Sequence, residues 1–226
     1  MPSPLEVLRQ VPLFSGLSDV DLQGFAPVLR ERRVTRGTVI MMQGERGDAL
    51  YLLAEGQVKV VLIGEDGREV ILSVLGPGSF FGEMALLDDE PRSAHVVVME
   101  ESLLLVLRRE DFQARLRSSP DVSLALLREL SQRLRRADDR IGNLALRDVN
   151  GRIAHLLLEL AHEEGGQGDR ITRRLTHATI AQMVGASRET VSRTLSTLTA
   201  AGVVRMTRRE IILVDKEPLR RAAQRQ

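Results

Sequence analysis

Two residues near the middle of the chain, Glu83 and Arg92, are of the types needed to hold a sugar phosphate. The guanidinium of Arg92 offers a fixed fork of N–H donors that suits a phosphate, and the carboxylate of Glu83 can accept from sugar hydroxyls. Gly82 lets the backbone approach a ligand closely, and a short helical turn after it would present free amides to an anion. Taken singly, a glutamate and an arginine at this spacing are also typical of a surface ion pair.

A second stretch, residues 175–195, has the residue order of a helix-turn-helix. Thr176 and Ser187 can cap its two helices, and Gly185 between them can adopt a turn conformation that a side chain would penalise. The residues expected to face inward are Ile180, Ala181 and Val184 in the first helix and Val191, Leu195 and Leu198 in the second.

The opposite side of the second helix carries polar residues near the end that enters the DNA major groove. Arginines such as Arg188 and Arg193 suit a bidentate contact to guanine, and Glu189 can accept from a cytosine amine. Thr190 can reach a phosphate or a base edge. The alternative is a surface helix with solvated side chains. Further basic residues that can neutralise phosphates are Arg170, Arg173, Arg174, His177, Arg205, Arg208 and Arg209.

The Glu83 and Arg92 region lies among short apolar runs separated by turn residues. These runs are residues 49–53, 58–63, 70–75, 95–98 and 103–107. Asp66 and Gly67 between two of them predict a hairpin. Many short strands at this spacing indicate a barrel or jelly roll, preceded by a helical leader at about 18–30.

Residues 120–147 are predicted to form one long helix. Its apolar positions follow a heptad spacing and are Leu127, Leu130, Leu134, Ala137, Ile141 and Leu144. Two interpretations compete, namely a helix packed on its own barrel and a parallel dimer coil. The stripe has only two apolar positions per heptad, which favours the dimer.

The rest of the chain is predicted to be helical, with a strand-like wing. Asp148 is a suitable N-cap for a helix at 151–164, which a glycine-rich loop follows. Two short helices at 176–184 and 187–201 precede the wing at 203–214. The polar tail, 220–226, is expected to fray.

Composition excludes several classes of function. The chain has 226 residues, 43% hydrophobic and 28% charged, with a formal net charge of +1 and no cysteine. The absence of cysteine excludes disulfides, thiol redox sensing and cysteine-ligated iron–sulfur clusters. No apolar run is long enough for a membrane span, and no signal peptide is evident, which is compatible with a cytoplasmic location. The four histidines lack metal-ligand spacing. The sequence also has no nucleophile motif and no P-loop, so it gives no indication of an enzyme.

Three segments carry a resemblance to a known family. FGEMALLDDEPRSAHV resembles the phosphate-binding cassette of cyclic-nucleotide-binding domains. SRETVSRTL resembles the recognition helix of the cyclic AMP receptor protein (CRP/FNR) family, and GNLALRDVNGRIAHLLLELA resembles its hinge and following helix. The likeness implies an α+β fold with an N-terminal cyclic-nucleotide-binding β-roll (jelly roll) at 1–119. It also implies a dimerisation helix and hinge at 120–147 and a C-terminal winged helix-turn-helix domain at 148–226.

The same resemblance implies roles for individual residues. Glu83 would bind the ribose 2′-hydroxyl, and Arg92 and Ser93 would bind the cyclic phosphate together with the amide of Gly82. The full ligand-binding set is Gly82, Glu83, Met84, Ala85, Arg92, Ser93 and Asp138. The DNA-binding set is Thr176, Ser187, Arg188, Glu189, Thr190, Ser192 and Arg193, and the arginines and Glu189 would contact a palindrome with TGTGA-like half-sites.

One departure from the family pattern concerns the nucleotide base. Nucleotide-binding members contact adenine across the dimer through a Thr-Ser pair on the long helix, where this chain has Ala137 and Asp138. Asp138 is an acceptor that suits the adenine amine, and it also suits the ring N–H and amine of guanine. Cyclic AMP is the first expectation, cyclic GMP or cyclic di-GMP the second, and DNA binding without ligand the third. Asp138 can also be a solvated residue beside Arg135 or Arg136.

The expected partners are therefore double-stranded DNA, a second copy of the chain through residues 120–147, and RNA polymerase. No metal, membrane or catalytic role is expected. A regulatory subunit that does not bind DNA is the remaining rival, and the winged helix-turn-helix argues against it.

Overall fold

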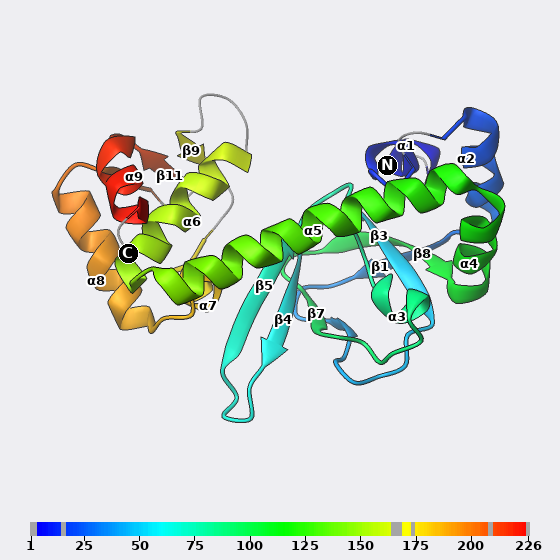
Figure 1. The fold of residues 1–226 in the computed structure, drawn as a ribbon, viewed down its shortest axis with the longest axis horizontal. Coiled ribbons are helices and arrows are strands. Elements are labelled where there is room, and N and C mark those ends of the chain that lie inside the picture. The colour runs from blue at the N-terminus through cyan, green and yellow to red at the C-terminus, as the bar shows by residue number, and fades with distance from the viewer. Residues whose placement is uncertain (1–3, 15–16, 164–168, 173–174, 208–209, 225–226) are drawn as a thin grey trace. The chain divides into compact units, whose positions relative to one another are not determined.

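The computed structural model describes residues 4–14, 17–163, 169–172, 175–207 and 210–224, and it divides into two compact units, Met1–Leu134 and Arg135–Gln226. The division falls within the long helix α5 (Pro120–Leu146), so this helix contributes to both units (Figure 1). The predicted domain limits at 119/120 and 147/148 stay predictions.

Two antiparallel sheets of four strands each build the first unit, as expected for a β-roll. One sheet has the order β1-β8-β3-β6 and the other β2-β7-β4-β5. The strands are β1 (Arg30–Val34), β2 (Val39–Met41), β3 (Ala49–Glu55), β4 (Val58–Ile63), β5 (Glu69–Leu75), β6 (Phe80–Phe81), β7 (His95–Val98) and β8 (Ser102–Arg108). All five predicted runs are strands, and the hairpin at Asp66 and Gly67 joins β4 to β5, with Gly67 at a φ of 76°.

The helices of the first unit differ from the expectation in two ways. The leader at 18–30 is not one helix, because α2 (Asp19–Phe25) gives way to the 3-10 turn η1 (Ala26–Val28), and β1 begins at Arg30. The helices α1 (Pro4–Gln10) and α4 (Arg109–Ser118) were not predicted. Phe112 is the only fully buried residue among the described residues of α4. The sequence of α4 therefore has little apolar periodicity from which a helix could be predicted.

The second unit is a winged helix-turn-helix. Its elements are α6 (Val149–Glu163), β9 (Arg170–Ile171), α7 (His177–Val184), α8 (Arg188–Ala200), β10 (Val204–Met206), β11 (Ile211–Leu213) and α9 (Lys216–Gln224). The three strands form a small antiparallel sheet in the order β10-β11-β9. Asp148 caps α6 as predicted, because its carboxylate accepts from the amide of Gly151 at 2.7 Å.

The prediction of a frayed C-terminal tail is wrong for the described residues. Residues up to Gln224 form α9, in which Leu219 and Ala223 are buried. These two positions lie four residues apart and share one helix face, which joins the apolar core formed with α6.

The apolar stripe of α5 is largely exposed. The exposed fractions of Leu127, Leu134, Ile141 and Leu144 are 60%, 64%, 65% and 54%, and only Leu130 packs against the core of the β-roll. For Leu127 and Leu134, which lie in the same unit as the barrel, the interpretation of a helix packed on its own barrel is therefore wrong. The dimer stays a prediction. No helix in the described part of the chain is long and apolar enough to cross a membrane.

Candidate functional sites

Gly82 follows β6 in a conformation that favours glycine. Its φ is +88°, and a Cβ there would lie 2.7 Å from Nη1 of Arg92 and 3.1 Å from the carbonyl oxygen of Ala49. Any side chain would therefore displace the arginine or the neighbouring strand. The sequence predicted that the backbone at Gly82 approaches a ligand closely. In the structure it approaches the side chain of Arg92 closely.

Arg92 is only 5% exposed, and its guanidinium is held by backbone carbonyls. Nη1 donates to the carbonyl of Gly82 at 2.5 Å, Nη2 donates to that of Ala49 at 2.8 Å, and the carboxylate of Asp48 lies 3.6 Å from Nη2. Burial lowers the pKa of Arg92 from its ordinary value, although an arginine stays protonated at neutral pH. The site thus contains a fixed, desolvated cation.

Glu83 is 2% exposed and is paired with an arginine that the sequence did not indicate. Nη1 of Arg133, on α5, donates to Oε1 of Glu83 at 2.9 Å, and Nη2 donates to the carbonyl of Phe80 at 2.7 Å. The guanidinium also lies 4.4 Å from the centre of the Phe80 ring. Burying a carboxylate is costly unless such a partner compensates for the lost hydration. Because Glu83 and Arg92 are both buried, they do not form a surface ion pair.

The remaining predicted ligand residues surround α3 (Met84–Leu87). As the first amides of a helix, the N–H groups of Met84 and Ala85 have no partner within α3. Ala85 is buried and Met84 is half exposed, and the hydroxyl of Ser93 lies 3.8 Å from the sulfur of Met84. Gly82, Glu83, Met84, Ala85, Arg92 and Ser93 lie on one chain segment of the first unit, which is called the effector site below. Asp138 belongs to the second unit, so its predicted role stays a prediction.

The helix-turn-helix has the predicted caps and turn. The hydroxyl of Thr176 accepts from the amide of Thr179 at 3.0 Å, and that of Ser187 accepts from the amide of Thr190 at 3.2 Å. Gly185 ends α7 at a φ of 64°, in the left-handed region. Ile180, Ala181, Val184, Val191 and Leu195 are buried as expected, and Leu198 packs against the same core.

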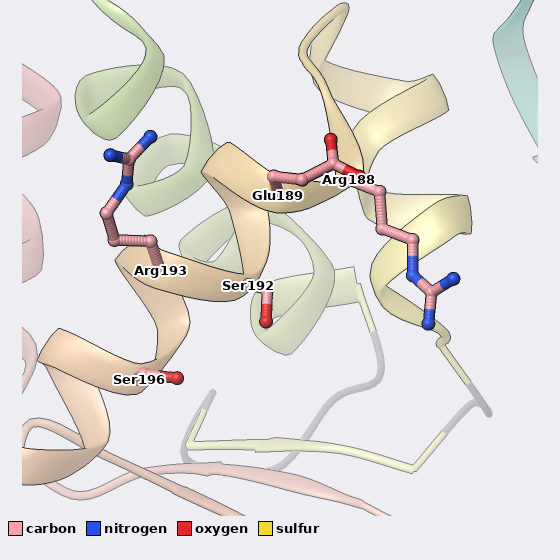
Figure 2. A pocket seen from close by; sticks show the side chains of 5 residues that line it. All are labelled: Arg188, Glu189, Ser192, Arg193 and Ser196. Carbon is pink, nitrogen blue, oxygen red and sulfur yellow. The ribbon is translucent and has the colours of Figure 1, made fainter.

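The outer face of α8 carries a shallow hollow, whose lining residues are Arg188, Glu189, Ser192, Arg193 and Ser196. Figure 2 shows the side chains of Arg188 and Arg193 extending in opposite directions along this face. Hydrogen bonds from the backbone amide of Glu189 and the hydroxyl of Ser187 lower the pKa of Glu189. Ser196 was missed, although it lies four residues after Ser192 and thus on the same side of the helix.

A side-chain hydrogen bond fixes this helix to its neighbour. The hydroxyl of Thr194 on α8 donates to the side-chain oxygen of Asn150 on α6 at 2.8 Å. The two residues are 44 positions apart, so the sequence carried no signal for the contact.

Of the predicted phosphate contacts, Arg170 and Arg205 are exposed. Four lie outside the described residues, namely Arg173, Arg174, Arg208 and Arg209.

A two-sheet domain with a buried arginine and glutamate, followed by a winged helix-turn-helix whose second helix has an exposed polar face, is typical of a DNA-binding regulator with a ligand-binding domain. Comparison with known proteins agrees. Residues 31–119 match the cyclic nucleotide-binding domain, and residues 151–222 match the Crp-like helix-turn-helix domain.

Individual relatives match most of the chain. It is 40% identical over 199 residues to the cyclic AMP receptor protein of Thermus thermophilus, covering 88% of this chain and 90% of that protein. It is 34% identical over 221 residues to the CRP-like cAMP-activated global transcriptional regulator of Mycobacterium tuberculosis, covering 96% and 99%. Among solved structures, the c-di-GMP responsive global regulator CLP of Xanthomonas campestris is similar, with a TM-score of 0.75, 26% identity and coverage of 87% and 99%.

The chain belongs to the CRP/FNR family of DNA-binding transcription regulators and contains a cyclic nucleotide-binding domain. This family consists of transcription regulators rather than enzymes.

Proposed function

We propose that the protein is a homodimeric, sequence-specific transcription regulator controlled by a cyclic nucleotide, with cyclic AMP as the first candidate. The observation that carries this proposal is the presence of two buried, oppositely charged side chains at the effector site, Arg92 and Glu83, in a chain whose helix α8 also has an exposed polar face. The DNA site would be a palindrome with TGTGA-like half-sites. RNA polymerase would be a partner, and the protein would act in the cytoplasm.

The donors and acceptors of the effector site fit a cyclic nucleotide. Arg92 and the first amides of α3 would hold the phosphate, and the exposed hydroxyl of Ser93 would donate to it. One oxygen of Glu83 accepts from Arg133, and the other would accept from the ribose 2′-hydroxyl. A bound phosphate would compete with the carbonyls of Gly82 and Ala49 for the guanidinium of Arg92.

Arg133 would connect ligand binding to dimer packing. It joins Glu83 to α5, the helix whose exposed apolar stripe would pair with a second copy. The nucleotide would favour one packing of that stripe, and a hinge near 147–150 would place the two α8 helices about 34 Å apart, one turn of DNA. The ligand shifts this equilibrium only by its difference in affinity for the two states.

The identity of the base has a second candidate. Asp138 can accept from both donors of guanine, and a similar solved structure is named as c-di-GMP responsive. Cyclic GMP or cyclic di-GMP is therefore the alternative effector, and DNA binding without any ligand is the third possibility. Calorimetric titration of the purified protein with the three nucleotides separates these cases.

Operator affinity measured with and without cyclic AMP tests the proposal. We expect tighter binding with the nucleotide, and equal affinities would refute cyclic AMP as the effector. Arg92→Ala should abolish the response and spare basal DNA binding, because it removes the cation of the effector site. Arg46→Ala is the matched control, since Arg46 is an exposed arginine in the same domain. If Arg92→Ala responds normally, the effector site is assigned wrongly.

A further inference from the structure

A second arginine, Arg109, lies next to the effector site at the start of α4. Its side chain is 15% exposed. Nη2 donates to the carbonyl of Gly47 at 2.8 Å and to that of Ala85 at 2.7 Å, and Nε donates to Gly47 at 3.2 Å. Nη1 pairs with the carboxylate of Asp89. One guanidinium therefore joins three separate points of the chain.

These points flank Arg92. Gly47 lies tightly between Ala85 and Arg92, because a Cβ on it would lie 2.7 Å from Cβ of Ala85 and 3.0 Å from Cζ of Arg92. The next two residues, Asp48 and Ala49, supply the carboxylate and the carbonyl that contact Nη2 of Arg92. The backbone amide of Arg109 also donates to the carbonyl of Asp48 at 2.9 Å.

The chain after α3 is held by the same side chain. Asp89 has a φ of 60°, the one non-glycine residue with positive φ among the described residues. Aspartate tolerates this left-handed conformation better than most residues, but it still needs support from its surroundings. The ion pair with Arg109 provides that support at the turn between α3 and Arg92.

Arg109 also affects the charge at the site. It donates to the carbonyl groups of Gly47 and Ala85, so its positive charge offsets their negative partial charge beside the effector site. Its positive charge is close enough to Arg92 that it adds to the effect of burial in lowering the pKa of Arg92. Two cations close to each other are unfavourable alone and become favourable when an anion binds.

We propose that Arg109 is a positioning residue for the effector phosphate: it holds the 47–49 backbone and α3 at the spacing that Arg92 and the α3 amides need, and it offsets the negative ends of two carbonyls there. This inference rests on the proposed function, since it assigns Arg109 to the same phosphate site. Arg109 itself does not need to touch the ligand. The probes are cyclic AMP, cyclic GMP and cyclic di-GMP.

The test compares Arg109→Gln and Arg109→Lys with wild type by calorimetric titration of the full-length protein. Arg109→Gln should weaken binding of the effector by about tenfold, because a charged group with several hydrogen bonds is lost. Arg109→Lys keeps the charge but cannot reach three partners, so its affinity should lie between those of wild type and Arg109→Gln. This graded rescue is not expected of a residue that only supports the fold.

Arg115→Gln is the matched control. Arg115 also lies on α4 and donates to a backbone carbonyl, that of Gly24 at 2.6 Å, and it packs 4.9 Å from the ring centre of Phe25. It should lower the unfolding temperature and leave effector affinity within about twofold of wild type. If both glutamine variants lose affinity equally, or if Arg109→Gln binds like wild type, the inference is overturned. If wild type binds none of the three nucleotides, the proposed function fails and the inference fails with it.

Discussion

The contact between Glu83 and Arg133 provides a quantitative prediction about stability. Arg133→Met keeps an apolar stem over the Phe80 ring and removes the guanidinium. The carboxylate of Glu83, whose side chain is 3% exposed, then loses its cation, while the Arg133 side chain is 28% exposed in the native protein. Breaking a fully buried pair costs about 3–5 kcal/mol, and the partial exposure of Arg133 reduces this, so we expect a loss of about 2 kcal/mol in the free energy of unfolding.

The assay uses the only tyrosine of the chain. Tyr51 lies buried in β3, with its ring 5.3 Å from that of Phe81, and the chain has no tryptophan. Its fluorescence during urea denaturation therefore reports the unfolding of the β-roll. Arg128→Met is the control, since Arg128 is an exposed arginine on the same helix and its loss should cost less than about 0.5 kcal/mol.

A double-mutant cycle tests whether the loss of stability in Arg133→Met comes from breaking the Glu83–Arg133 pair. Glu83→Gln removes the charge that Arg133 neutralises, so the double variant should be more stable than the sum of the single losses predicts. The expected coupling energy is about 1–2 kcal/mol, in the range found for residues of one hydrogen-bonded network. A coupling energy within about 0.5 kcal/mol of zero would refute the reasoning.

Three further predictions concern DNA contact, assembly and pH. Arg193→Ala should relax base preference at one position and cost about 1–3 kcal/mol in a gel-shift titration, whereas a uniform loss on every sequence would assign Arg193 to a phosphate. Leu134→Glu should shift the sedimenting species from dimer to monomer, because it places a charge in the exposed apolar stripe of α5, and an unchanged dimer contradicts the proposed interface. His155 has its pKa lowered by burial and by the charge of Arg147. It therefore contributes stability that is present above its unfolded pKa of about 6.5 and is lost as pH falls through its lower folded pKa. Circular dichroism melts of His155→Gln should show a weaker loss on acidification, and an identical slope would exclude His155 as the cause.

Local features of the helix-turn-helix could be predicted because their causes lie within a few residues. Thr176 and Ser187 accept from amides three positions later. The left-handed backbone conformation at position 185 favours a glycine. The hairpin at Asp66 and Gly67 depends on the same kind of short-range requirement. Such features follow from the order of residue types and need no knowledge of distant parts of the chain.

Other elements could not be predicted because their stability comes from distant partners. The helix α9 has few apolar residues, and its two buried positions matter only once α6 provides a surface for them. The same applies to α4, which packs Phe112 into the core of the β-roll. Apolar periodicity within one segment is too weak a signal for such short, mainly charged helices.

The effector site also has some features that follow from the sequence and others that depend on distant parts of the chain. The sequence by itself indicated Gly82, Glu83 and Arg92 as candidate ligand-binding residues, through their types, spacing and family resemblance. Only the tertiary structure decided that Glu83 pairs with Arg133, 50 residues away, and that Arg109 holds Gly47, 62 residues away. The physical reason is that a buried charge is stable only with a partner of suitable geometry, and the fold determines which of the chain's many arginines can reach it.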